Sequence, residues 1–386
     1  MVDVPINPAV IKWAREERRL SPADAARRLK ITEARLAEIE ASDSVPLPLL
    51  RKMAKKYEIS FGTLLMPEPL PTMTRPKIED FRTHGGLPAE MDHKLIVELE
   101  NVNEQLDTMA ELKEVVPELF AAPPLTHATR AGSAERLAEG ERQRLGIDPL
   151  VQLGWEGASE GFKRWRAAIE GKGIFVYLLN LGPDTNCRGF SLLGERDIPV
   201  IAINNDERDA AARTFTLMHE YGHLLIRETG LSDQRGHPVE RFCNQFAAFL
   251  LMPRQQFLAE AKLLNPQNGP WTDALMGKLA ERFKVSRTAV AIHLEDAALA
   301  PVGFYAAKEA EWNKPKKKKK GGPPTPYEEK RVNRWGARHV DLVFNALDRG
   351  HINQLDAYEL LGVRPKYFNA LRREVREQQA AYGGAR

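Results

Sequence analysis

The sequence predicts an α+β fold that is mostly helical. Apolar residues recur every three or four positions over most of the 386 residues, which is helical spacing. Only three runs, at residues 174–180, 187–193 and 199–205, are short, apolar and β-rich, as buried strands are. Proline-rich residues 67–76 and Lys/Pro/Gly-rich residues 313–326 interrupt the helical parts. We therefore expect a small mixed or antiparallel sheet among several helical units.

Composition excludes several classes of protein. The 56 lysines and arginines nearly balance the 53 aspartates and glutamates. The chain is therefore neither a strongly basic protein that coats polyanions nor a strongly acidic, highly hydrated protein. Two cysteines, Cys187 and Cys243, do not make a disulfide framework and favour a reducing compartment. No apolar run resembles a signal peptide or reaches the roughly 18 residues of a membrane span. These features predict a cytoplasmic protein with no membrane partner.

The first segment, residues 1–70, predicts a bundle of four or five short helices. Ser21-Pro22 is a helix start, with serine as N-cap and proline at the first helical position. Thr32 similarly caps a helix over residues 33–41. A short turn between the second and third helices is the helix-turn-helix arrangement. The segment resembles the Xre/Cro-type repressor domain, including its closing stretch, residues 57–65.

The resemblance implies that this domain binds an operator DNA. The recognition helix carries three glutamates, which weaken the electrostatic attraction to phosphates. The glycine usual in the preceding turn is replaced by Lys30-Ile31. The sequence leaves open whether the bundle binds DNA or instead docks a partner. The expected DNA contacts are Arg27, Arg28, Lys30, Thr32 and Arg35.

A connector, residues 71–131, follows the first domain. Its prolines prevent regular structure at the start, and residues 91–120 then show apolar positions at helical spacing. Such a helix either forms a homodimer or covers the next domain, and the spacing alone does not separate these roles.

The strongest chemical signal is His219-Glu220-x-x-His223 within an apolar run, residues 214–226. Residues four apart share one face of a helix, so the two histidines can chelate one metal ion. Glu220 lies beside them and can reach a water bound to that ion. A chance match is disfavoured because the flanks are apolar, as a buried active-site helix requires.

A catalytic zinc site needs a third protein ligand. Downstream candidates are Glu228, Asp233, His237 and Glu240. We favour Glu240 over His237 because it opens a helix whose alanines allow close approach to the histidine helix at Gly222. Asn244 falls on the same face as Glu240, where it would support that ligand from behind.

Residues 199–253 resemble the ImmA/IrrE family of metallo-endopeptidases. The matching pieces are Ile-Asn-Asn before the helix, Arg-x-x-Thr-x-x-His-Glu-x-Gly-His-Leu-Leu, and Glu-x-x-x-Asn-x-Phe-Ala-Ala-x-Leu-Leu-Met-Pro. The resemblance implies a zincin-like peptidase domain in which His219, His223 and Glu240 bind Zn²⁺. It implies that Glu220 is the catalytic base. Cys243 stands where an alanine is usual in the family.

We expect five parts in the chain. They are a helix-turn-helix domain (1–70), the helical connector (71–131), a zinc metallopeptidase domain (132–300), a linker (301–326) and a helical partner-binding tail (327–386). Within the peptidase domain, residues 271–300 have a second helix-turn-helix-like pattern, which we interpret as structural. A DNA contact through Lys284 and Arg287 is the alternative.

The family resemblance implies a regulatory peptidase that acts on a protein substrate. Long relatives with a repressor domain often cleave repressors or are encoded beside a toxin that they neutralise. The implied function is a transcriptional regulator and antitoxin with peptidase activity. The alternative is a non-catalytic antitoxin or DNA-binding regulator in which zinc only stabilises the fold.

Overall fold

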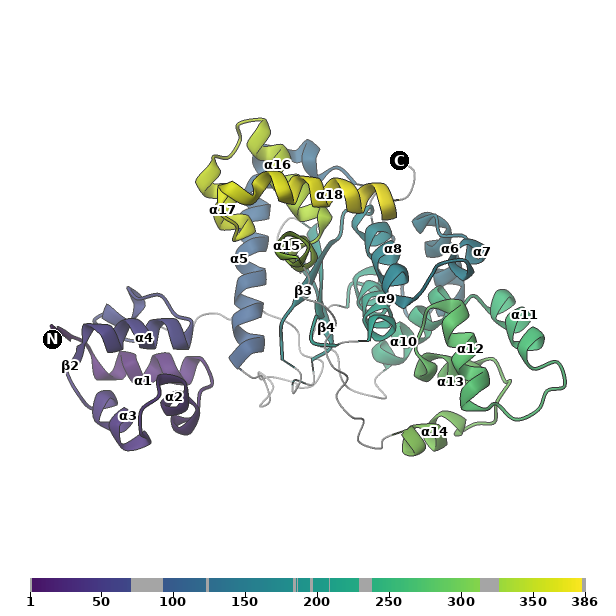
Figure 1. Ribbon diagram of the computed structural model, residues 1–386, viewed down its shortest axis with the longest axis horizontal. Helices are drawn as coiled ribbons and strands as arrows, with labels where there is room; N and C mark the ends of the chain where they lie inside the picture. Colours follow the sequence, from purple (N-terminus) through teal and green to yellow (C-terminus); the bar gives the residue numbers. More distant parts are fainter. Residues whose placement is uncertain are drawn as a thin grey trace. The chain divides into compact units, whose positions relative to one another are not determined.

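The structure, a computed structural model, describes residues 2–70, 93–122, 125–182, 185, 187–194, 197–207, 209–228, 238–312 and 326–383. They belong to two compact units, residues 1–78 with 83–104 and residues 79–82 with 105–386. The predicted mostly helical α+β class is confirmed (Figure 1). In the described residues, no helix combines the length and apolarity needed to cross a membrane.

The first unit is a helix-turn-helix bundle. Its core contains Leu29, Leu36 and Met53, all at most 1% exposed. Two strands of three residues each pair antiparallel, and they are too short to leave a periodic signal in the sequence. Its elements are β1 (Asp3–Pro5), α1 (Pro8–Glu17), α2 (Pro22–Leu29), α3 (Glu33–Glu40), β2 (Ser44–Pro46), α4 (Leu47–Tyr57) and η1 (Thr63–Leu65).

The turn between α2 and α3 forms without glycine. Lys30 ends α2 in the left-handed conformation, with φ of 53°. That conformation costs a non-glycine residue roughly 1 kcal/mol. Thr32 caps α3 as predicted, because its side chain accepts a hydrogen bond from the Arg35 amide at 3.1 Å.

The long connector helix is α5 (His93–Val115), whose first residues belong to the first unit and whose last residues belong to the second. Its apolar residues Leu95, Leu99, Val102 and Leu106 are buried within the single chain.

The second unit contains a mixed three-stranded sheet. Its strands are β3 (Phe175–Leu179), β4 (Gly189–Gly194) and β5 (Ile198–Asn204). They lie in the order β3-β5-β4, with β5 parallel to β3 and antiparallel to β4. All three strands lie within a few residues of the ends that the sequence predicts.

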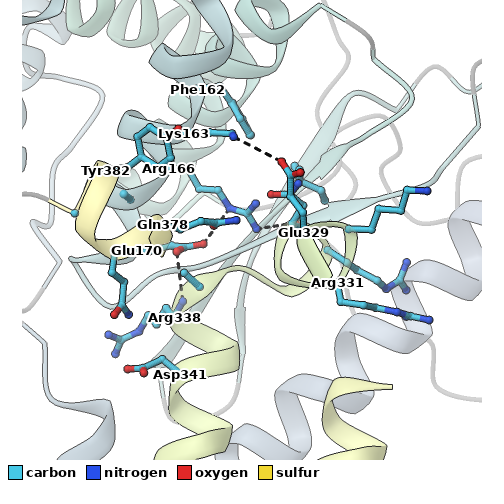
Figure 2. A pocket seen from close by; sticks show the side chains of 18 of the residues that line it. Phe162, Lys163, Arg166, Glu170, Glu329, Arg331, Arg338, Asp341, Gln378 and Tyr382 are labelled. Carbon is cyan, nitrogen blue, oxygen red and sulfur yellow. Dashed lines mark hydrogen bonds and ion pairs between the residues drawn. The ribbon is translucent and has the colours of Figure 1, made fainter. Parts of the chain in front are cut away.

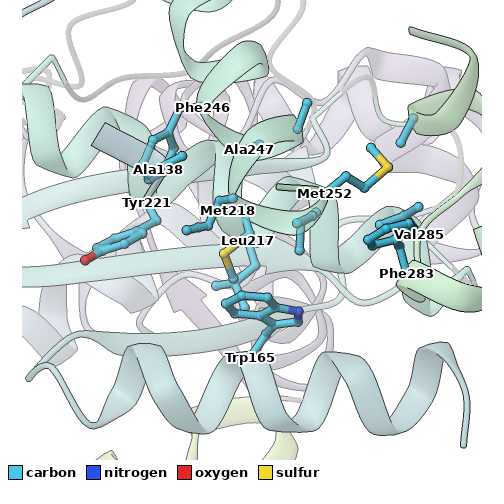
Figure 3. Close-up of a cluster of buried hydrophobic side chains, with 14 of the residues drawn as sticks. Ala138, Trp165, Leu217, Met218, Tyr221, Phe246, Ala247, Met252, Phe283 and Val285 are labelled. Carbon is cyan, nitrogen blue, oxygen red and sulfur yellow. The ribbon is translucent and has the colours of Figure 1, made fainter. Parts of the chain in front are cut away.

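The main core lies on one face of this sheet. Val176, Leu178, Ile201 and Ile203 pack there with side chains from several helices. Figure 3 shows Trp165, Leu217, Met218, Tyr221 and Phe246 meeting in this core. The surrounding helices are α6 (Ala134–Leu145), α7 (Pro149–Leu153), α8 (Ala158–Glu170), α9 (Ala210–Ile226), α10 (Pro238–Leu251), α11 (Arg254–Leu264), α12 (Asp273–Phe283), α13 (Arg287–Asp296) and α14 (Phe304–Trp312).

The α12–α13 pair repeats the turn chemistry of α2–α3. Lys284 is left-handed, with φ of 60°, and the Ser286 side chain accepts from the Ala289 amide at 3.1 Å. Here, however, the apolar face of α13 is buried in the main core. The Lys284 ammonium donates to the Leu153 and Glu281 carbonyls, so it is committed inside the unit. Lys284 is therefore not placed to contact DNA, whereas Arg287 is exposed and pairs with Asp273 at 3.4 Å.

The C-terminal helices differ from the predicted tethered tail. They are α15 (Tyr327–Trp335), α16 (Ala337–Asp348), α17 (Gln354–Leu361), η4 (Pro365–Tyr367) and α18 (Phe368–Tyr382). They belong to the second unit and cover the other face of β3, where the Tyr177 ring meets Trp335 at 5.1 Å between centroids. The reason is that every residue of β3 is apolar or aromatic, so both faces of the strand require a cover.

A buried ion pair anchors these helices. Arg166 on α8 donates from Nε to Glu170 at 3.0 Å and from Nη2 to the Asn333 carbonyl at 2.9 Å. The other Glu170 oxygen lies 3.4 Å from the backbone nitrogen of Arg338, at the start of α16. Both Arg166 and Glu170 are buried, so removing either side chain would leave the charge of the other buried without a partner charge.

Candidate metal centre

The helix α9 carries the His-Glu-x-x-His motif. It begins at the Asp209 cap, whose side chain accepts from the Ala211 amide at 2.9 Å, and it ends at left-handed Arg227. His219, Glu220 and His223 are 8%, 1% and 0% exposed, so the helix takes all three polar side chains into the protein. Buried polar groups in a protein interior need partners of matching chemistry.

The crossing of α9 and α10 is close at Gly222. A Cβ added there would lie 3.0 Å from Phe246 Cδ1 and 3.4 Å from Cys243 Sγ. Because glycine permits this approach, Glu240 at the start of α10 reaches the two histidines.

The structure brings His219, His223 and Glu240 together as a possible metal-binding group. The two Nε2 atoms lie 3.1 Å apart. Glu240 places Oε2 3.2 Å from His219 Nε2 and Oε1 3.2 Å from His223 Nε2. Donor atoms bound to one tetrahedral zinc ion at about 2.0–2.1 Å lie about 3.3 Å from one another, so this spacing fits such an ion.

The electrostatics of the cluster also fit a cation. Burial opposes ionisation of Glu240, but the hydrogen-bonding imidazoles of His219 and His223 outweigh it and lower the pKa of Glu240 to about 2. Burial likewise opposes a charge on His223, yet Cys243 and Glu240 raise its pKa well above the ordinary value. Among the described residues, no lysine or arginine lies within ion-pair distance of Glu220 or Glu240. A bound metal ion would take the place of the imidazole protons as the positive charge beside these carboxylates.

A backbone carbonyl orients His223. Its Nδ1 lies 2.7 Å from the Glu228 carbonyl oxygen, so Nδ1 donates there and the Nε2 lone pair faces the cluster. The Glu228 carboxylate itself pairs with Arg130 at 2.5 Å, which removes it from the candidate ligands. Asp233 and His237, which the sequence also offers as third ligands, lie outside the described residues.

Glu220 faces strand β4. Burial raises its pKa, while His223, His219 and the Ser191 hydroxyl oppose that rise. A Cβ added at Gly189 would lie 2.7 Å from Thr216 Cγ2 and 3.5 Å from Glu220 Cγ. Sequence reasoning missed the roles of Ser191 and Gly189, although a glycine within a strand often marks such a close approach.

Asn244 is not where the sequence predicts it. It is exposed, whereas its neighbour Cys243 is fully buried and contacts His223. Burial raises the pKa of the Cys243 thiol, and His223 opposes that rise. The rotation of α10 therefore turns Cys243, rather than Asn244, toward the histidine helix.

The predicted DNA contacts lie on the α2-turn-α3 segment of the first unit. Lys30, Thr32 and Arg35 are exposed, and Arg28 is half-buried. Two of the arginines already have acidic neighbours, since Arg27 pairs with Asp24 and Arg35 pairs with Glu38 at 2.7 Å. DNA would have to compete with these surface ion pairs, which are weak.

Family comparisons agree with these features. Residues 170–295 match the model of a peptidase family described as the IrrE N-terminal-like domain, and residues 11–64 match a helix-turn-helix model. The matches have the predicted order along the chain, so the family resemblance is confirmed. No curated protein and no solved structure matched the chain.

Proposed function

We propose that this chain, which joins a helix-turn-helix domain to a domain of the IrrE N-terminal-like peptidase family, is a zinc-dependent metallo-endopeptidase. The observation that carries the proposal is the buried group of His219, His223 and Glu240 beside Glu220. As a regulator in the cytoplasm, it would cleave a protein partner and bind DNA through its first unit.

Each residue has a chemical task in this proposal. A zinc ion bound here would supply a Lewis acid that polarises the peptide carbonyl and acidifies water. Glu220 accepts a proton from the attacking water and returns it to the leaving amine nitrogen. The Glu228 carbonyl holds His223 in the tautomer that presents Nε2.

The ligand assignment predicts a specific loss of metal. Glu240→Ala should weaken zinc binding by more than about 100-fold, since even groups behind the ligands cost about 10–100-fold. Glu228→Ala should retain zinc, because it keeps the backbone carbonyl that orients His223. Zinc per chain after dialysis against graded chelator measures both. Tight zinc in Glu240→Ala would place the third ligand elsewhere, with His237 as the next candidate.

The substrate and the antitoxin role rest on the family resemblance. A toxin encoded nearby or a repressor would be the partner. Co-purification of the Glu220→Gln chain from its native host, with mass spectrometry, would capture that partner. A non-catalytic antitoxin or regulator with a structural zinc site is the alternative, and complementation by the same Glu220→Gln chain separates the two.

DNA binding is proposed for the α2-turn-α3 surface. In a gel-shift assay with the protein's own promoter, we expect binding that weakens as salt rises. Lys30→Gln should reduce, by about one, the slope of the logarithm of the binding constant against the logarithm of the salt concentration. Each contact with a phosphate contributes about one to that slope. Lys12→Gln on α1 is the control, since Lys12 is exposed but lies outside the turn. Absence of salt-sensitive binding by the parent chain would contradict the proposal.

A further inference from the structure

A cleft of about 1410 Å³ lies within the second unit, away from the metal centre. One wall comes from α8, β3 and the first turns of α9, and the other comes from α15, α16 and α18 (Figure 2). None of His219, Glu220, His223 and Glu240 lines it. The cleft exists only because the C-terminal helices dock on the peptidase domain.

The cleft is strongly basic. Eight of its lining residues are lysine or arginine, and three are acidic. Two of the acids are already neutralised, Glu170 by Arg166 at 3.0 Å and Glu329 by Lys163 at 3.6 Å. In the part of the chain that the structure describes, five of the cations have no carboxylate within ion-pair distance: Arg213, Lys330, Arg331, Arg338 and Arg376.

Two of these five cations are partly withdrawn from water. Burial lowers the pKa of both Arg213 and Arg338. The Nε atom of each is buried and has no hydrogen-bond partner among the described residues. Carboxylates attract both groups from beyond ion-pair distance, Glu207 and Asp209 in the case of Arg213 and Glu170 and Asp341 in the case of Arg338. A phosphate that accepts directly from these guanidinium groups would offset the cost of their burial.

Aromatic and amide side chains accompany the charges. Tyr382, whose ring centroid lies 5.4 Å from Lys163 Nζ, and Tyr327 both line it. Gln378 points into the same space. Tyrosine rings stack on nucleobases, and amides hydrogen-bond to base edges. The volume exceeds the roughly 300–1,000 Å³ of ordinary small-molecule sites, so a ligand with several phosphates fits.

We propose that this cleft binds a nucleoside polyphosphate, with the phosphates among the five unneutralised cations and the base against Tyr382. The ligand would contact both walls and so tie the C-terminal helices to the peptidase domain. This proposal does not depend on the proposed peptidase activity.

The test uses the full zinc-loaded chain and fluorescent ATP and GTP analogues, followed by anisotropy. We expect saturable binding that the double variant Arg331→Gln/Arg376→Gln weakens by more than about 10-fold, since phosphate contacts are charge-assisted. Arg373→Gln is the matched control, because Arg373 is exposed on the same helix α18 but does not line the cleft. No binding at millimolar nucleotide, or equal loss in the control, would overturn the proposal.

A second variant tests the base. Tyr382→Leu should weaken the nucleotides at least about 5-fold while leaving inorganic tripolyphosphate unchanged, because only the base stacks. Tripolyphosphate binding as tightly as ATP would reduce the cleft to a plain anion site and overturn the nucleotide assignment. Preference for long single-stranded DNA over mononucleotides would overturn it as well.

Discussion

Replacing Glu220 with glutamine is expected to lower the rate of peptide cleavage by about 10²- to 10⁴-fold, the range that general acid–base catalysis supplies. The amide keeps the shape of the side chain but cannot accept the proton of the attacking water. Burial already raises the pKa of Glu220, which suits a group that must take up a proton and release it again. The effect is measured as the rate at which each purified chain cleaves the partner that was captured from the native host.

The zinc content of the Glu220→Gln chain shows whether a lower rate comes from loss of the catalytic base or from loss of the folded metal site. Glu220 is not among the three grouped ligands, so the variant should hold one zinc per chain, as the parent does. Glu228→Gln is the control for a nearby carboxylate, because that side chain pairs with Arg130 outside the cluster. If the Glu220→Gln chain complements a deletion strain as well as the parent, catalysis is dispensable and a non-catalytic regulator is favoured.

Gly336→Ala is expected to release the C-terminal helices from the peptidase domain. Gly336 has φ of +85°, and a Cβ there would overlap Glu170 Oε1 and lie 2.9 Å from the Val176 carbonyl. Relief requires moving either the buried Arg166–Glu170 pair or the start of α16. We expect a loss of about 3 kcal/mol in the free energy of unfolding, in the range of buried-network disruption. Urea denaturation measures it, and limited proteolysis reports on the exposed helices.

Gly350→Ala separates the steric clash from backbone strain. Gly350 lies two residues after the end of α16 and also has positive φ, +75°, but an added Cβ meets nothing within 4 Å. It should cost about 1 kcal/mol, the strain of a left-handed alanine. Equal losses in the two variants would show that the contact with Glu170 does not decide the docking. The nucleotide cleft shares this docking surface, so Gly336→Ala should also impair binding there.

Much of the local structure was predictable because its causes are local. Ser21, Thr32 and Ser286 cap helices through their own side chains. The α9 helix follows from its apolar run, and the four-residue spacing of His219 and His223 puts both on one face. The close approach of α10 could also be anticipated from Gly222 and the alanines of α10. The two-stranded β1–β2 pairing had no such signal.

The sequence by itself determined the helix-turn-helix bundle, the histidine helix and the order of the parts, because caps, periodicity and spacing act between near neighbours. Only the tertiary structure decided which side of α10 faces α9, and therefore that Cys243 rather than Asn244 contacts His223. Tertiary structure also decided that the helices of residues 327–383 pack on the peptidase domain. Their helices look independent in sequence, yet a strand that is apolar on both faces gains more by being covered than by facing water.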